Sequence, residues 1–178
     1  TVSSAGQYVC VGYKVNSTPV SAYSSDGQSW STPAAMNGST VNAKMISVAV
    51  NSAGLYVAVG YNVNNYPLVA TSSDGITWTT PALMNSSSVY ARLLGITVNS
   101  SDKFVAVGYD TNSYPVAAYS TNGTTWTTPA TMNGSTTYCR IQSVTVNAAG
   151  KFVAVGFNSP SYPYSAYSTD GTTWRTPV

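Results

Sequence analysis

The pattern of hydrophobic and polar positions predicts short β-strands. Residues 45–50 alternate between larger apolar side chains and small or polar ones, which is the period of a strand. Residues 56–61 form a continuous apolar run, with β-branched valines on one face and Ala58 and Gly60 on the other. Such a run is typical of a strand that is buried on both faces, and its small residues indicate a close neighbour.

Two more strands complete the same unit. Pro67 opens a strand over 68–72, where its missing N–H is tolerated. A tight turn follows at residues 74–75, and a fourth strand over 77–80 ends at Pro81. No segment has the 3.6-residue period of an amphipathic helix. The unit is therefore four short strands in about 48 residues.

The chain contains four copies of this unit. The register has no insertion, and four tryptophans recur every 48 residues, at Trp30, Trp78, Trp126 and Trp174. Four-stranded units of this length are the signature of β-propeller blades. We expect an all-β fold, one β-propeller domain over 1–178, with repeats at about 1–42, 43–90, 91–138 and 139–178.

The first repeat begins late. Thr1 and Val2 align with the end of a first strand, so this copy lacks most of its innermost strand. A closed four-bladed ring is the favoured arrangement. The alternatives are half of a larger ring completed by a second copy, or an open array. For the first blade, three explanations stay open: it has three strands, a neighbouring chain completes it, or the true chain is longer.

The turn before each tryptophan carries a family resemblance. In the second copy it reads Ser72-Ser73-Asp74-Gly75-Ile76-Thr77-Trp78. This resembles the Asp-box of bacterial-neuraminidase-type repeats, shortened by one residue and with Asn122 replacing Asp in the third copy. The resemblance implies a propeller of the group that includes sialidases, other glycosidases, sorting receptors and lectin-like modules. For the box itself, we expect a structural role, with Asp capping backbone N–H groups and Gly supplying a positive φ.

Composition argues against catalysis. There is no His, and the five acidic residues are all Asp, so no Glu acid/base and no His–Ser couple exists. The sialidases that the repeats resemble need a Glu-assisted Tyr, an Asp acid/base and an arginine cluster. Three of the five Asp here lie in the boxes, and Asp102 and Asp110 fall in turns. We therefore expect no enzyme, no cofactor and no metal site.

The charge pattern also limits the partners. A net charge of +2 over seven Lys and Arg is too sparse to track phosphates, so nucleic acid is not expected. The apolar runs fall far short of the roughly 20 residues of a membrane span, so membrane insertion is not expected either.

The two cysteines interrupt an Ala consensus in the first and last copies. Cys10 replaces Ala58, and Cys139 replaces Ala91 at another position of the repeat. In a closed four-bladed ring these copies are neighbours, so a disulfide could link the fourth blade to the first and stabilise the closed ring. The alternative is two independent buried thiols.

One face of the propeller is predicted to gather the candidate ligand-binding residues. The loop between the second and third strands and the connection between blades should share this face, while the Asp-box turns occupy the other. An amide, a tyrosine and a cation recur there three times along the chain, at Asn37, Lys44, Tyr66, Asn85, Arg92, Tyr114, Asn133, Arg140 and Tyr162.

Aromatic rings, amides and a cation suit a polyhydroxylated ligand. The sequence thus favours a non-catalytic, lectin-like protein that binds a glycan or another polar small ligand at repeated sites. The alternative is a structural or protein-interaction module of a surface assembly. An extracellular or cell-surface location is expected, where the Asn-x-Ser/Thr sites at Asn16, Asn37, Asn85, Asn99, Asn122 and Asn133 could be glycosylated.

Overall fold

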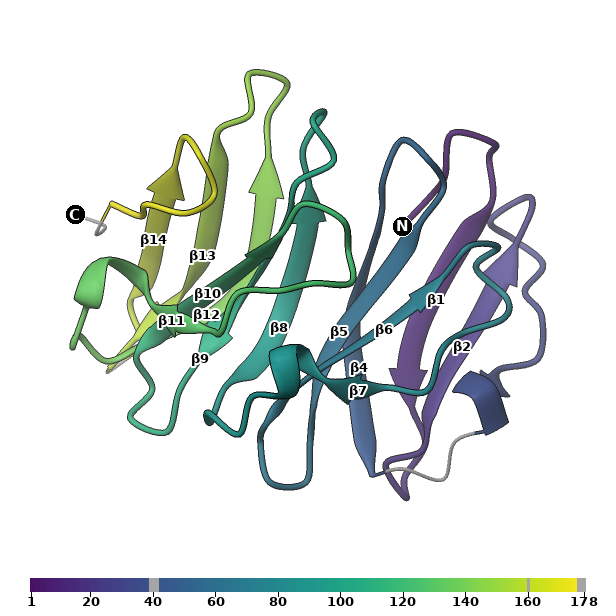
Figure 1. Cartoon of the computed structure of the whole chain (residues 1–178), viewed down its shortest axis with the longest axis horizontal. Helices are drawn as coiled ribbons and strands as arrows, with labels where there is room; N and C mark the ends of the chain where they lie inside the picture. Colours follow the sequence, from purple (N-terminus) through teal and green to yellow (C-terminus); the bar gives the residue numbers. More distant parts are fainter. Residues whose placement is uncertain (39–41, 160, 176–178) are drawn as a thin grey trace.

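The computed structural model describes residues 1–38, 42–159 and 161–175. Its strands form four antiparallel sheets, one for each repeat (Figure 1). The first sheet contains β1 (Tyr8–Tyr13), β2 (Pro19–Ser24) and β3 (Ala34–Ala35), and the second contains β4 (Ala43–Val50), β5 (Tyr56–Asn62), β6 (Pro67–Ser72) and β7 (Ala82–Leu83).

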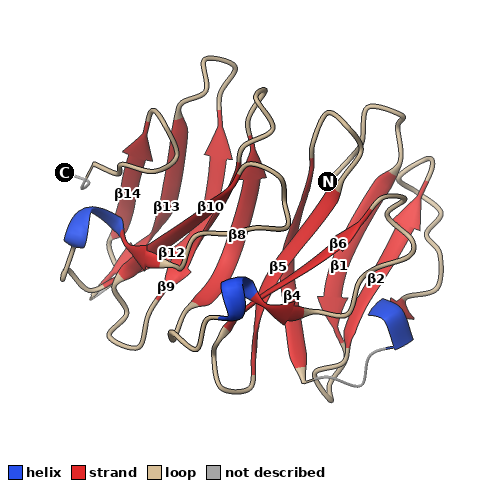
Figure 2. Cartoon of the chain, viewed as in Figure 1, coloured by secondary structure: helices blue, strands red, loops and turns tan. Residues whose placement is uncertain are grey.

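The third and fourth sheets repeat this order. The third contains β8 (Arg92–Val98), β9 (Phe104–Tyr109), β10 (Pro115–Ser120) and β11 (Ala130–Thr131), and the fourth contains β12 (Cys139–Val146), β13 (Phe152–Asn158) and β14 (Pro163–Ser168). Helical structure in the described part is limited to three short 3₁₀ turns, η1 (Met36–Gly38), η2 (Met84–Ser86) and η3 (Met132–Gly134) (Figure 2). The four sheets confirm the all-β expectation, although residues 176–178, the end of the fourth repeat, lie outside the described residues. The fourth strand predicted over 77–80 is corrected, because β7 begins only after Pro81, at Ala82.

Within a sheet, the first strand of the repeat is innermost, and it pairs with the second strand through a β-bulge. The bulge falls at the same place in β4, β8 and β12, for example between Met45 and Ser47. Opposite it stands a glycine, Gly60 in the second sheet, whose missing Cβ makes room for the backbone carbonyl of Lys44. The bulge and the glycine therefore depend on each other in every sheet that has an innermost strand.

The first sheet has no such strand, as the sequence predicted. It consists of β1, β2 and β3 in that order, and Val2 forms only an isolated bridge to Tyr8. Gly12, the counterpart of Gly60, has no atom within 4 Å of the place where a Cβ would stand.

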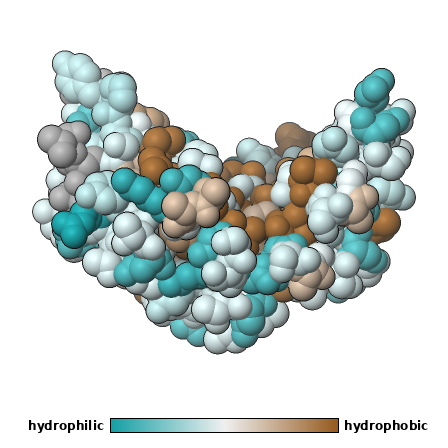
Figure 3. Space-filling model, turned by 90° about the horizontal axis from the view of Figure 1, so that it is seen from above, coloured by the Kyte–Doolittle hydropathy of each residue, from teal (hydrophilic) through white to brown (hydrophobic). Residues whose placement is uncertain are grey.

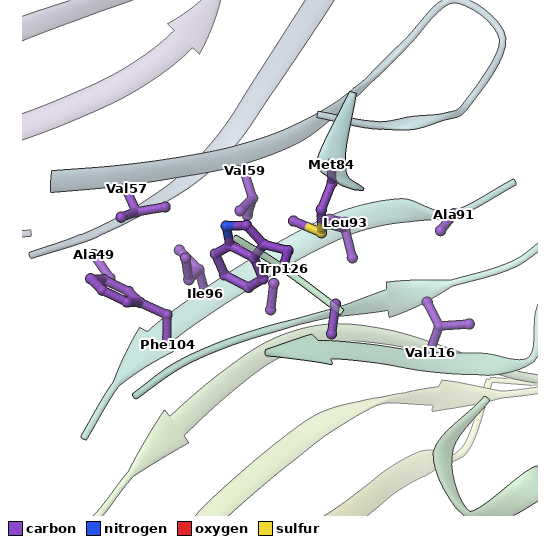
Figure 4. Close-up of a cluster of buried hydrophobic side chains, with 12 residues drawn as sticks. Ala49, Val57, Val59, Met84, Ala91, Leu93, Ile96, Phe104, Val116 and Trp126 are labelled. Atoms are coloured by element: carbon purple, nitrogen blue, oxygen red, sulfur yellow. The ribbon is translucent and has the colours of Figure 1, made fainter. Parts of the chain in front are cut away.

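The core lies between consecutive sheets. Figure 4 shows the junction of the second and third sheets, where Trp126 lies beside Val59, Met84 and Leu93. Corresponding clusters join the first sheet to the second and the third to the fourth. Each fully buried side chain of this size contributes about 1.5–3 kcal/mol, so these junctions hold the molecule together.

The four sheets form an open arc. Contacts join β1 to β4, β4 to β8 and β8 to β12, while no comparable contact joins the first sheet to the fourth within the described residues. Figure 3 shows the resulting crescent, with apolar residues gathered along its hollow side. Within the described residues, the four sheets therefore do not close into the favoured four-bladed ring.

The open arc also corrects the expectation for the cysteines. Cys10 is exposed on β1 and Cys139 is buried in β12, and both are free thiols. They belong to the first and fourth sheets, at opposite ends of the arc (Figure 1). The structure contains no disulfide between them, since the seam that it was expected to close does not exist.

Replacing Gly60 with Ala should destabilise the protein, while the same change at Gly12 should not. A methyl group at Gly60 overlaps the backbone of Lys44, which cannot move without disturbing the bulge. We expect the free energy of unfolding of Gly60→Ala, measured by denaturant titration, to fall by about 1–3 kcal/mol. Gly12→Ala is the matched control and should change it by about 0.5 kcal/mol or less. Equal effects of the two substitutions would contradict this role of the glycine.

Candidate ligand-binding site

Three cations stand at the same position of successive sheets, each paired with an aromatic residue across the strands. Lys44 pairs with Tyr61, Arg92 pairs with Tyr109, and Arg140 occupies the same place opposite Phe157. Directly opposite residues of an antiparallel pair project from the same face of the sheet. The β-ladder alone therefore places a cation beside an aromatic ring in three of the four sheets.

Each cation also reaches the tyrosine of the preceding sheet. The Nζ of Lys44 lies 5.2 Å from the ring centroid of Tyr13 and 5.9 Å from that of Tyr61. The guanidinium carbon of Arg92 lies 5.4 Å from the ring of Tyr61 and 5.8 Å from that of Tyr109. These are cation–π distances.

Arg140 continues the series at 5.2 Å from Tyr109, and a further ring, Tyr138, lies 5.5 Å from it. Cations and tyrosines thus alternate along the arc. We call this set the cation–tyrosine belt; its members are Tyr13, Lys44, Tyr61, Arg92, Tyr109, Arg140 and Tyr138.

Loop residues fix the arginines of the belt. The Nε of Arg92 donates to Oδ1 of Asn65 at 2.7 Å, and its Nη1 donates to the hydroxyl of Tyr109 at 3.0 Å. The Nε of Arg140 donates to Oγ of Ser113 at 3.1 Å. For Lys44, the contacts described are the two rings. The protein therefore orients the two arginines by hydrogen bonds, while the described contacts of the Lys44 amine are with the two tyrosine rings.

The belt borders a cavity of about 280 Å³ at the loop end of the second sheet. A lysine, an arginine, a tyrosine and two amides meet there, and the full lining is Ser17, Lys44, Tyr61, Asn62, Val63, Asn65 and Arg92. Of the predicted site residues, Lys44 and Arg92 line this concave site, and its aromatic ring and amides come from other residues than the predicted ones.

The structure brings together only part of the predicted site. Lys44, Arg92 and Arg140 lie in the belt, next to the loops that end in Tyr66 and Tyr114. The backbone N–H of Tyr66 donates to Oδ1 of Asn62, which shapes the first of these loops. Tyr162 lies in the corresponding position of the fourth sheet and is exposed.

The three asparagines Asn37, Asn85 and Asn133 lie elsewhere. Each adopts a left-handed backbone in a 3₁₀ turn. The amide of Asn37 donates to Oγ1 of Thr80, and that of Asn85 donates to Oγ1 of Thr128, so both face the Asp-box side of the next repeat. Asn37 lines a groove of about 450 Å³ with Trp78, and Asn133 lines one of about 390 Å³ with Trp174. The expectation that these amides join the cations is corrected by this arrangement.

Sequence reasoning missed the belt tyrosines Tyr13, Tyr61 and Tyr109. They belong to the repeated Val-Gly-Tyr sequence, which indicates only the end of a buried strand. A signal was available, because a cation precedes the bulge of the innermost strand by a fixed interval in the second, third and fourth copies. Using it required the strand register, which the bulge shifts by one residue.

The Asp-box-like turns have a structural role in the described residues. Oδ1 of Asp74 accepts the N–H groups of Ile76 and Thr77 at 2.8 and 2.7 Å, and Oγ of Ser72 donates to the same oxygen at 2.9 Å. In the third copy, Oδ1 of Asn122 accepts the corresponding bonds from Thr124 and Thr125. A neutral amide thus performs the same task, so the turn needs an oxygen acceptor rather than a charge.

Comparison with known proteins identifies the fold. No protein-family model and no curated protein matches the sequence. Among solved structures, the BP39L lectin from Burkholderia pseudomallei matches with a TM-score of 0.74 and 10% identity, over 97% of this chain and 51% of the lectin. Trypanosoma rangeli sialidase matches with a TM-score of 0.65 and 16% identity, over 98% of this chain and 36% of the sialidase.

An exo-β-1,3-galactanase from Phanerochaete chrysosporium matches with a TM-score of 0.63 and 16% identity, over 97% of this chain and 47% of the enzyme. The chain therefore spans about half the length of the lectin and less of the two enzymes. At these identities the likeness concerns the fold, which is that of lectin and glycosidase propellers. In the described part of the chain, no helix is long and apolar enough to cross a bilayer, and no cluster of three metal-ligating side chains occurs.

The Asp-box-like turns should make the fold sensitive to acid. Hydrogen bonds from the N–H groups of Thr77 and Ile76 lower the pKa of Asp74 from 3.8 to about 2, and those of Ser29 and Gln28 do the same for Asp26. Because the pKa is lower in the folded state, the stabilisation is complete above about pH 4 and is lost as the pH falls toward 2. We expect the melting temperature to decrease over that window.

The third copy provides matched variants for this prediction. Asp74→Asn should lessen the acid-induced loss of melting temperature while preserving the turn, as Asn122 does naturally. Asn122→Asp should increase the loss by adding a fourth titrating turn. If both variants lost the same melting temperature as the parent between pH 4 and pH 2, the turns would not be the acid-sensitive elements.

Proposed function

We propose that this chain is a non-catalytic, carbohydrate-binding protein whose ligands bind along the cation–tyrosine belt. The observation that carries the proposal is the cavity at the second sheet, where Lys44, Arg92 and Tyr61 meet the amides of Asn62 and Asn65. Amides can donate hydrogen bonds to sugar hydroxyls and accept them, and cations can donate them. An accessible tyrosine offers its apolar ring to the C–H side of a sugar.

The belt favours acidic glycans over neutral ones. Each of the five aspartates accepts hydrogen bonds elsewhere: three in the Asp-box-like turns, Asp102 from Ser52, and Asp110 from its own loop. The three belt cations thus have tyrosines and loop residues as their described partners, and their charge is available. A carboxylate or sulfate on the ligand would form charge-assisted hydrogen bonds with them.

Binding without cleavage is consistent with the composition. The chain has no Glu and no His. The carboxylates of Asp26, Asp74 and Asp170 accept backbone hydrogen bonds within their own turns. The belt therefore does not contain the pair of carboxylates with different pKa values that two-carboxylate glycosidases require. Repetition along the arc supports several weak sites that act together, as expected for a protein that meets glycans outside cells or on their surface.

Removing a belt cation should weaken glycan binding, while removing a similar cation elsewhere should not. We expect Lys44→Met and Arg92→Met each to cost about 1–3 kcal/mol at the affected site, since a charged hydrogen-bond donor is lost. The measurement is titration calorimetry with acidic and neutral glycans selected on an array, at low and high salt.

Lys103→Met is the matched control. Lys103 also lies over a tyrosine, with its Nζ 4.4 Å from the ring centroid of Tyr119, but it is outside the belt. It carries the same charge as Lys44, so a purely long-range effect of charge would appear in both variants. The proposal fails if binding survives Lys44→Met and Arg92→Met, or if Lys103→Met weakens it equally.

A further inference from the structure

Every junction between sheets joins the same two kinds of surface. The second strand of each repeat presents valines on one face, such as Val57 and Val59, and an aromatic residue followed by a small one on the other, such as Phe104 and Ala106. We call these the valine face and the aromatic face. In all three junctions, the valine face of one sheet packs against the aromatic face of the next.

The arc leaves one copy of each face without a partner. On the valine face of the fourth sheet, Val155 is 46% exposed, whereas its counterparts Val59 and Val107 are 0% exposed. On the aromatic face of the first sheet, Trp30 is 44% exposed, whereas Trp78, Trp126 and Trp174 are each 3% exposed. Cys10 on β1 is also exposed, at the position where the other repeats bury an alanine. These residues keep the apolar character of a junction although they are exposed in the part of the chain that the structure describes.

The two residues that form a polar contact in the third junction have equivalents at the two ends of the arc. There the Nζ of Lys103 donates to the backbone carbonyl of Asp170 at 2.6 Å. The repeat places Lys151 on the bare valine face and Asp26 beside the bare aromatic face. Lys151 lies 4.4 Å from the ring of Tyr167, as Lys103 lies from that of Tyr119, so the donor is already held in the orientation that the third junction uses.

We infer that a second copy of this chain docks head to tail, with the aromatic face of its first sheet on the valine face of the fourth sheet. The contact continues the three junctions within the chain, and Lys151 would donate to the Asp26 carbonyl of the second copy. Because the first sheet lacks an innermost strand, this junction buries less than an internal one, so association depends on concentration. The contact is heterologous, since different surfaces meet, and it extends or closes the arc.

Sedimentation velocity of residues 1–178 over a concentration series tests the inference. We expect a dimer or larger species to appear with rising concentration, and Val155→Asp to raise the dissociation constant at least about tenfold, because it buries an unpaired charge in the junction. Val89→Asp is the matched control: Val89 is 47% exposed on a connection in the middle of the chain, away from both end faces, and the variant should associate as the parent does. A chain that stays monomeric up to about 1 mM overturns the inference.

Mixing two variants distinguishes a head-to-tail contact from a two-fold one. Val155→Asp damages the fourth sheet, and Cys10→Asp damages the first sheet, so each should be monomeric alone. The mixture retains one intact pair of faces and should form a one-to-one complex. No complex in the mixture would overturn the head-to-tail arrangement, even if the parent dimerises.

Thiol reactivity gives a readout that needs no variant. Cys10 should react with N-ethylmaleimide in dilute protein and become protected at high concentration, because the junction covers it. Cys139 should stay unreactive in both, since it is buried and burial raises its pKa to about 12. Equal Cys10 reactivity at concentrations below and above the association midpoint would place the contact elsewhere and overturn the inference.

Discussion

The structure depends on one constraint, that the apolar faces of a sheet are buried against neighbouring sheets. A strand with valines on one face and an aromatic and small residues on the other is fully buried only when another sheet covers each side. The repeat meets this need by stacking, with Trp126 and Met84 filling one junction and their counterparts filling the others. A single repeat could not meet it, so fold stability is a property of the junctions rather than of the sheets.

The candidate site is a consequence of the same stacking. The bulge in the innermost strand and the glycine opposite it set the register that places Lys44 across from Tyr61. The spacing of the sheets then brings the cation of one sheet over the tyrosine of the one before. Ligand chemistry and junction geometry are therefore coupled, and a change in the angle between sheets would alter both the belt and the ends of the arc.

Several features could be read from the residues, and others could not. The 48-residue period identified four units of short strands, and the alternation within Met45–Val50 located an innermost strand. Asn37 was grouped with Lys44 because the two are close in the sequence, but the amide of Asn37 donates to Oγ1 of Thr80 in the next repeat. The tyrosine of Val-Gly-Tyr was overlooked because a strand pattern does not reveal what lies across a bulge.

The sequence by itself determined the first three strands of the repeat unit, its 48-residue period and the lack of Glu and His, because these depend on local periodicity and composition. Tertiary structure alone decided that the arc stays open, that Cys10 and Cys139 remain apart, and that Lys44, Arg92 and Arg140 form one belt. The physical reason is that the angle between sheets and the register across a bulge arise from packing between residues far apart in the chain. Neither quantity is encoded in any single repeat.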